Sequence, residues 1–283
     1  IKHHHKNHYC ELVLDKTPFY AEAGGQAGDS GHLTGNGFNF KVYDVQKLGE
    51  EYIHLGEITA GSIENIQNVK AIINESRRNA IRRNHTATHL LHQALKDILG
   101  DHVQQAGSLV EEESLRFDLT HYEQITFDQI IKIENLVNNI ILRNISVSTE
   151  ILPYKDARDS GAISLFGEKY GDLVRVVNVP GFSKELCGGT HVHRTGDIGG
   201  FKVISETALA TGIRRITAVT GEAIPLLITR QDHLIRNIRN ALKCSEEEMI
   251  DRLVMLLTEQ SSIKDVLISS AELSTILTPE SLN

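Results

Sequence analysis

The sequence is poor in cysteine, in long apolar runs and in positive charge, and each shortage excludes a class of protein. Cys10, Cys187 and Cys244 are the only cysteines among 283 residues; an odd number so far apart argues against a disulfide framework and for a reducing compartment. No apolar run approaches the roughly 18 residues of a membrane span, and no signal peptide opens the sequence, so we expect a cytoplasmic protein without a membrane partner. The formal net charge of −8 gives no reason to expect DNA binding.

Histidine, in contrast, is abundant, and with one cysteine it forms two spacings that are typical of metal ligands. His85 and His89 make an HxxxH, and about a hundred residues later Cys187 and His191 make a CxxxH. Three imidazoles and one thiol are the donors that Zn²⁺ prefers. Alone, the histidine pair arises easily by chance and Cys187 would be a small buried side chain. The combination predicts one Zn²⁺ per chain.

The first pair lies in a segment with a clear helical pattern that ends at Gly100. At 100° per residue, six apolar side chains cluster on one side: Ala87, Leu90, Leu91, Ala94, Leu95 and Ile98. His85, His89 and His92 fall on the opposite side, so the helix holds them away from its apolar core. His92, and His193 next to the second motif, are therefore rival ligands.

The pattern along the chain predicts an α+β protein in three parts. Residues 1–75 read as short strands and glycine-rich turns, which favours a small β-barrel. Residues 76–221 combine the histidine helix and a second amphipathic helix at 127–144 with strands, which predicts a mainly antiparallel sheet covered by two long helices. These strands are expected at 115–119, 147–152, 173–179, 200–205 and 215–219. Residues 222–283 read as a helical tail, with helices at 223–242 and 246–257.

Eight segments occur in the same order as in the editing region of alanyl-tRNA synthetases, which this chain therefore resembles over residues 12–221. They are 18–26, 84–91, 105–110, 115–118, 166–171, 185–191, 195–199 and 212–216. The resemblance implies a β-barrel followed by a deacylase core, a tail leading toward a further domain, and an aminoacylation module with its ATP chemistry outside this segment.

The function implied by the resemblance is hydrolysis of serine or glycine wrongly attached to tRNA(Ala), whose acceptor end is the expected partner. The four candidate zinc ligands match that family's ligands. Thr88 and Gln105 match positions linked with substrate recognition and activity. Without the resemblance, Thr88 would be interpreted as a helix threonine bonded to a backbone carbonyl, and Gln105 as an exposed loop amide. Glu168 and Lys169 read as a surface ion pair with little part in the chemistry.

Two arginine clusters are candidates for contacts to tRNA phosphates, although such clusters are more often solvated surface. They are Arg77, Arg78, Arg82 and Arg83 before the histidine helix, and Arg214 with Arg215.

Three other functions compete with this interpretation. One is a free-standing editing deacylase, and another is a tRNA-binding module whose zinc is purely structural, because four protein ligands close a tetrahedral shell while catalytic zinc keeps one position open. A metalloprotease is disfavoured, because Thr86 stands where the zincin motif has its glutamate.

Overall fold

The computed structural model describes residues 2–6, 9–64, 66–164 and 170–260, and it has the predicted α+β fold with antiparallel sheets. The chain divides into two compact units, Ile1–Ile224 and Pro225–Asn283. The predicted three-part division stays a prediction, and the Glu168–Lys169 pair lies outside the described residues.

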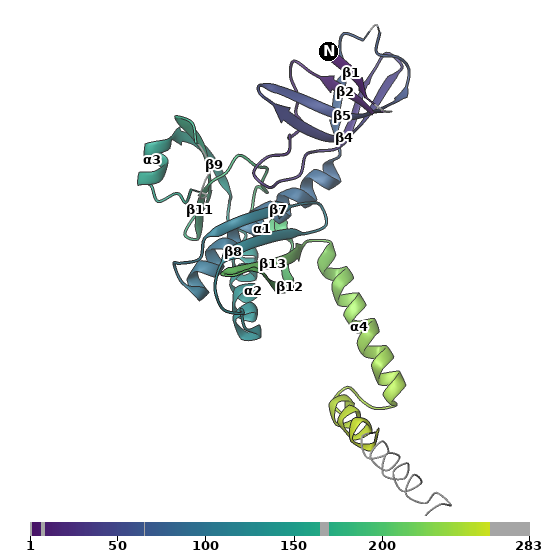
Figure 1. Ribbon diagram of the computed structural model, residues 1–283, viewed down its shortest axis with the longest axis vertical. Coiled ribbons are helices and arrows are strands. Elements are labelled where there is room, and N and C mark those ends of the chain that lie inside the picture. The colour runs from purple at the N-terminus through teal and green to yellow at the C-terminus, as the bar shows by residue number, and fades with distance from the viewer. Residues whose placement is uncertain (1, 7–8, 65, 165–169, 261–283) are drawn as a thin grey trace, which may run out of the picture. The chain divides into compact units, whose positions relative to one another are not determined.

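The N-terminal strands pair into one antiparallel sheet in the order β1-β2-β5-β4-β3-β6 (Figure 1). Their bounds are β1 Lys2–Lys6, β2 Tyr9–Val13, β3 Gly31–Gly35, β4 Phe38–Leu48, β5 Glu51–Ala60 and β6 Lys70–Ile73. Phe38, Phe40 and Val42 alternate along β4 with more exposed residues and are buried with Leu12 and Leu33, which is the period-two pattern of a sheet with one buried face. The sheet order leaves β1 and β6 as edges, so closure into a barrel stays a prediction.

The histidine helix is α1, Glu75–Leu99. The Asn74 side chain accepts a hydrogen bond from the Arg77 backbone N–H and begins the helix. Gly100, at a φ of 115°, donates its N–H to the Lys96 carbonyl and ends the helix where the sequence predicts.

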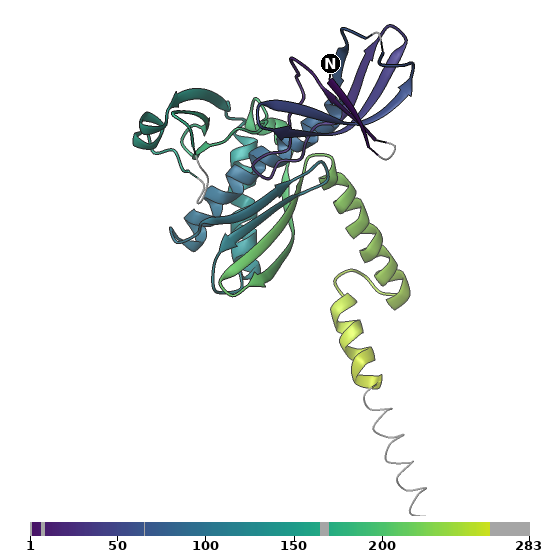
Figure 2. The ribbon, with the colours of Figure 1, turned by 45° about the horizontal axis from the view of Figure 1, so that its top comes forward.

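A four-stranded antiparallel sheet, in the order β12-β13-β8-β7, packs against α1 and α2. Its strands are β7 Gln105–Val110, β8 Leu115–Thr120, β12 Phe201–Ala210 and β13 Ile213–Thr220, and α2 is Phe127–Leu142. Leu115, Phe117 and Leu119 alternate along β8 and share one core with Leu90 of α1 and Val137 of α2, so both helices cover the same face, as Figure 2 shows. The predicted cover of two helices is confirmed.

A smaller antiparallel sheet, in the order β11-β10-β9, carries the cysteine motif at its end. Its strands are β9 Ser148–Pro153, β10 Leu173–Val179 and β11 Ser183–Leu186, with the short helices α3 Tyr154–Asp159 and η1 Thr195–Ile198 nearby in sequence. Cys187 follows β11 directly, and its N–H donates to the Arg175 carbonyl of β10.

The second unit consists of helices in its described part. Helix α4, Ala223–Leu242, has the predicted bounds, and a further helix covers residues 249–260, three residues later than predicted. No residue of α4 is buried. Among the described residues, the structure has no helix that combines the length and apolar character needed to cross a membrane.

Candidate metal centre

Helix α1 presents its histidines to a second layer of the protein rather than to solvent. Ala87, Leu90 and Leu91 pack into the core beneath the four-stranded sheet. His85 and His89 face away from it, as predicted, but they are only 6% and 7% exposed. The cysteine motif after β11 covers them, which the helical pattern alone does not reveal.

The four predicted ligands come together in one cluster. Their ligand atoms all lie within 4.8 Å of one another. The Cys187 Sγ is 3.4 Å from His85 Nε2 and 3.3 Å from His191 Nε2. Two stretches of chain a hundred residues apart therefore present three imidazoles and one thiol to the same point, an arrangement that could hold one metal ion.

Neither rival ligand joins this cluster. The Nδ1 of His92 lies 3.0 Å from a Glu185 carboxylate oxygen, and its ring packs against Phe117. His193 is exposed beside the Arg82–Arg83 surface.

An outer side chain orients each histidine of the cluster through the ring nitrogen that faces away from the centre. His85 Nδ1 lies 2.6 Å from Gln26 Oε1, His89 Nδ1 lies 2.5 Å from Glu185 Oε2, and His191 Nδ1 lies 3.2 Å from Thr86 Oγ1. This is the usual outer support of metal-binding histidines, since it directs Nε2 to the metal. The His89 Nε2 is buried and has no hydrogen-bond partner among the described residues. Burial of an unpaired polar atom is unfavourable, and coordination of a metal would remove that cost.

The cluster also carries buried negative charge. Burial by itself lowers the pKa of His89, but the Glu185 carboxylate and the Cys187 thiolate raise that pKa to about 10. Burial raises the pKa of Glu185, yet the nearby His89 brings it to about 2. Burial likewise raises the pKa of Cys187, but His85 and His89 hold it well below its usual value of 9.0. Burial and the neighbouring His85 lower the pKa of His191 to about 3, which leaves that ring neutral.

The His89 imidazolium thus faces two negative charges, on Glu185 and Cys187, at neutral pH. A divalent cation would replace the His89 proton and offset both anions. The donor set, the orphaned nitrogen and the charge therefore all fit a bound metal ion.

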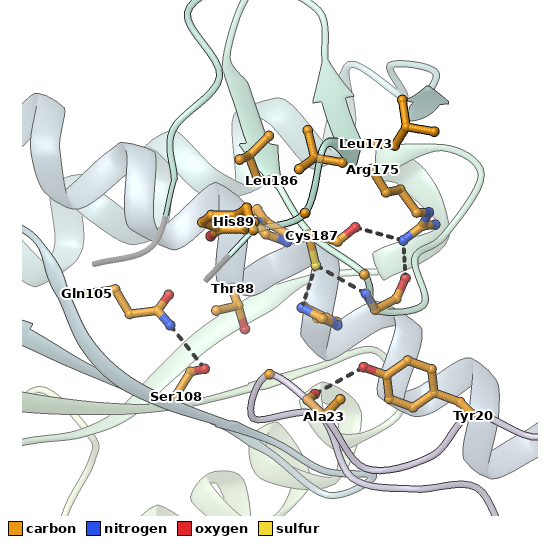
Figure 3. A pocket seen from close by; sticks show the side chains of 17 residues that line it. Tyr20, Ala23, Thr88, His89, Gln105, Ser108, Leu173, Arg175, Leu186 and Cys187 are labelled. Carbon is orange, nitrogen blue, oxygen red and sulfur yellow. Dashed lines mark hydrogen bonds between the residues drawn. The ribbon is translucent and has the colours of Figure 1, made fainter. Parts of the chain in front are cut away.

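The cluster opens onto a pocket of about 330 Å³ (Figure 3). Its walls come from α1, β7, the start of β10 with the residues before it, the cysteine motif, and the segment that contains Tyr20, Ala23 and Gly24. Thr88 and Gln105 both line this pocket, as Figure 3 shows.

These two predicted residues differ in how their surroundings hold them. The Thr88 hydroxyl donates to the Asn84 carbonyl at 2.8 Å. This is the bond that a threonine within a helix commonly makes to the carbonyl four residues earlier. Gln105 lies in β7 rather than in a loop, half-buried, and its Nε2 donates to Ser108 Oγ at 3.3 Å.

The chain is similar in sequence to two synthetase families and to several alanine–tRNA ligases. The family described as "Threonyl and Alanyl tRNA synthetase second additional domain" matches residues 174–217, and "tRNA synthetases class II (A)" matches residues 1–77. Alanine–tRNA ligase of Hydrogenovibrio crunogenus is 48% identical over 253 residues, and that of Legionella pneumophila (strain Lens) is 47% identical over 251. This chain matches a segment of the alanine–tRNA ligases. The ligase of Acetivibrio thermocellus is 45% identical over 280 residues.

The chain spans only about a third of those alanine–tRNA ligases. The matches cover 89% of this chain and 29% of the Legionella and Hydrogenovibrio proteins, and 93% of this chain and 32% of the Acetivibrio protein. The similarity therefore places it as a segment within the alanine–tRNA ligase sequence.

Four of the six candidate arginines form close ion pairs with carboxylates inside the chain. Arg77 pairs with Glu112, Arg78 with Asp29, Arg214 with Glu206 and Arg215 with Asp118. Arg78 is buried and also donates to the Pro18 carbonyl, so it joins α1 to the segment between β2 and β3 instead of facing solvent. Arg82 contacts Asn79, and Arg83 lies 3.7 Å from the exposed Glu222, so these two are the most available cations.

The sequence patterns predict no role for the outer partners Gln26, Glu185 and Thr86. One signal was present for Glu185, because residues two apart in a strand share a face and Cys187 follows two residues later. Gln26 offered no such signal, since it belongs to the N-terminal segment, 59 residues before His85.

Proposed function

We propose that this chain is the editing part of an alanine–tRNA ligase and hydrolyses the ester of seryl- or glycyl-tRNA(Ala) in a zinc-dependent pocket. The whole enzyme would attach alanine to tRNA(Ala) with ATP in the cytoplasm. The observation that carries the proposal is the opening of the His85–His89–Cys187–His191 cluster onto the pocket that contains Thr88 and Gln105.

A second, hydrolytic site answers a physical limit on selection. A pocket shaped for alanine cannot strongly reject the smaller glycine, and it discriminates poorly against serine, which merely adds a hydroxyl. A polar pocket can distinguish serine from alanine, because only serine forms a hydrogen bond there.

Thr88 has the properties needed to recognise serine. Its hydroxyl proton is directed to the Asn84 carbonyl, so the oxygen can only accept a further hydrogen bond. A serine hydroxyl can donate to it, whereas the alanine methyl would leave it without a partner. Gln105 and Ser108 add polar groups on the strand across the pocket, where they would hold the ester end of the substrate.

The metal in this proposal is Zn²⁺, held by the three Nε2 atoms and the Cys187 thiolate. When bound, zinc supplies Lewis acidity that polarises a carbonyl or acidifies a water. The chain itself holds the donors, through Gln26, Glu185 and Thr86, in the tautomers that coordination requires.

Arg82 and Arg83 are the residues we propose to contact the acceptor end of tRNA. They line a depression of about 230 Å³ together with His193, and Lys or Arg side chains supply the salt-dependent affinity for phosphates. The paired Arg77, Arg78, Arg214 and Arg215 contribute less, because a phosphate would have to displace a carboxylate.

Hydrolysis of Ser-tRNA(Ala) by the full chain, with Ala-tRNA(Ala) as the comparison, tests the function. We expect rapid release of serine, slow release of alanine, and loss of serine release after treatment with a chelator or in Cys187→Ala. Cys244→Ala is the matched control, because Cys244 lies outside the cluster. Full activity of a metal-free Cys187→Ala variant would remove zinc from the mechanism.

The complete set of four protein donors supports a second candidate, a tRNA-binding module with a structural zinc. Such a module would bind Ser-tRNA(Ala) without shortening the lifetime of its ester. The same assay therefore separates the two functions.

A further inference from the structure

The side chain of Gln26, in the segment between β2 and β3, reaches from the N-terminal part of the chain to the metal cluster. It is 1% exposed. Its Oε1 lies 2.6 Å from His85 Nδ1 and also accepts a hydrogen bond from the Thr190 backbone N–H at 2.8 Å. Its Nε2 donates to the Thr190 hydroxyl at 3.0 Å. One carboxamide therefore bridges His85 on α1 and the loop between Cys187 and His191.

These contacts determine the orientation of the carboxamide and the tautomer of His85. A backbone N–H can only donate, so the atom that faces Thr190 N must be the amide oxygen and not the NH₂ group. The same oxygen faces His85 Nδ1, which must then carry the proton. In the neutral ring the lone pair then lies on the remaining nitrogen, Nε2, which is 3.4 Å from the Cys187 Sγ and is the atom that would bind a metal.

The loop closes tightly at this point. A Cβ on Gly189 would overlap the His85 ring and lie 2.7 Å from Gln26 Oε1. Arg175 supports the loop from the other side, since its guanidinium donates to the Cys187 and Gly189 carbonyls at 3.0 and 2.5 Å.

The segment that carries Gln26 is itself anchored to the pocket wall. The Val110 N–H of β7 donates to the Gly25 carbonyl at 2.7 Å, and the Ala27 N–H donates to the Val110 carbonyl at 3.0 Å. A Cβ on Gly25 would lie 2.5 Å from the Ser108 carbonyl oxygen, so only glycine permits this approach. The backbone around Gln26 is thus held on both sides.

We infer that Gln26 is a positioning residue of the metal site: it selects the ligand tautomer of His85 and clamps the loop that carries Cys187 and His191. The inference rests on the proposed metal site. It makes the N-terminal segment part of that site rather than a separate neighbour.

The test is the affinity of the full chain for Zn²⁺, measured by competition with a chromophoric chelator, for the wild type, Gln26→Leu and Gln26→Glu. Loss of an outer partner typically lowers metal affinity 10–100-fold, and we expect a loss of about that size in Gln26→Leu. In Gln26→Glu the carboxylate can still accept from His85 and Thr190, so we expect affinity within about threefold of wild type. The Asn side chain in Gln26→Asn is too short to bridge both partners, so we expect this variant to lose as much affinity as Gln26→Leu. If Gln26→Leu does not fold, Gln26→Asn takes its place in the comparison.

Asp29→Asn is the matched control. Asp29 belongs to the same segment and joins it to α1 through Arg78, without touching a metal ligand. We expect Asp29→Asn to lower stability and leave zinc affinity within about threefold of wild type. The absorption of the Co²⁺-substituted chain provides a second readout, because it reports the geometry of the thiolate and imidazole ligands directly.

The outcomes separate this inference from the function proposed above. Wild-type affinity in Gln26→Leu and Gln26→Asn, or an equal loss in Gln26→Glu or Asp29→Asn, overturns the positioning role alone. A wild-type chain that binds neither Zn²⁺ nor Co²⁺ overturns the metal site and the inference together. Tight, Gln26-dependent zinc binding without hydrolysis of Ser-tRNA(Ala) supports the inference and overturns the proposed function.

Discussion

Two adjacent glycines in the cysteine motif have opposite surroundings. A Cβ on Gly189 would overlap the His85 ring, whereas a Cβ on Gly188 would meet no atom of the described residues within 4 Å. The second glycine is therefore required by space around the metal site, and the first is not.

At the residue scale, we expect Gly189→Ala to weaken Zn²⁺ binding at least tenfold, because the added methyl group displaces the His85 ring from its Gln26 contact. Gly188→Ala, the matched control, should bind as the wild type does. Chelator competition measures both. Equal affinities for the two variants would contradict the packing described around His85.

The protonation of His89 leads to a prediction about pH. Because its pKa is raised to about 10 by Glu185 and Cys187, the metal-free ring is protonated at pH 7 and must lose that proton to coordinate. The Cys187 pKa is already well below 9.0, so the thiol contributes less. We expect Zn²⁺ uptake at pH 7 to release about one proton from His89. Because that proton competes with the metal, we also expect zinc affinity to rise about tenfold per pH unit until the pH approaches 10.

Isothermal titration in buffers of different ionisation enthalpy measures that proton. Glu185→Gln is the control, since it removes the carboxylate that holds the charge on His89 and should reduce proton release. A binding enthalpy independent of the buffer in the wild type would show that His89 is already neutral.

At the scale of single elements, α2 begins with a complete capping box. The Gln129 N–H donates to Thr126 Oγ1 at 3.3 Å, and the Thr126 N–H donates to Gln129 Oε1 at 2.9 Å. The helix ends at Leu142, two residues before the predicted end, and Asn144 has a φ of 51°.

We expect Thr126→Ala to lower the free energy of unfolding by about 1 kcal/mol, because a backbone N–H at the start of α2 loses its acceptor. Thr126→Ser keeps the hydroxyl and should stay close to the wild type. Urea unfolding followed by circular dichroism compares them. An unchanged midpoint in Thr126→Ala would mean that water replaces the cap at no cost.

At the scale of the whole molecule, every group that forms the candidate metal centre belongs to the unit Ile1–Ile224. The outer partners Gln26, Thr86 and Glu185 belong to it as well. No residue of α4, which continues into the second unit, is buried.

We therefore expect a chain ending at Ile224 to fold and to bind one Zn²⁺ with an affinity within about threefold of the full chain. Metal analysis and chelator competition on the two purified chains provide the comparison. A large loss of affinity in the shorter chain would show that the metal site depends on residues 225–283.

Local patterns predicted most of the elements, because they depend on neighbours in the chain. The apolar stripe of α1 and its stop at Gly100 were confirmed, and so were the bounds of α4 and the strand at 173–179. The short strands β3, β6, β7 and β11 were not predicted. β3 begins and ends with glycine, and four-residue strands such as β6 and β11 are too short to show an alternating pattern.

The amino-acid sequence alone predicted the four candidate donors, because HxxxH on a helix and CxxxH on a glycine turn each bring two side chains together through local backbone geometry. Only the tertiary structure decided what surrounds them: burial of both α1 histidines, the pairing of Arg78 with Asp29, and the reach of Gln26 into the cluster. These features depend on how segments distant in the chain pack against one another, and spacing along the chain carries no information about that.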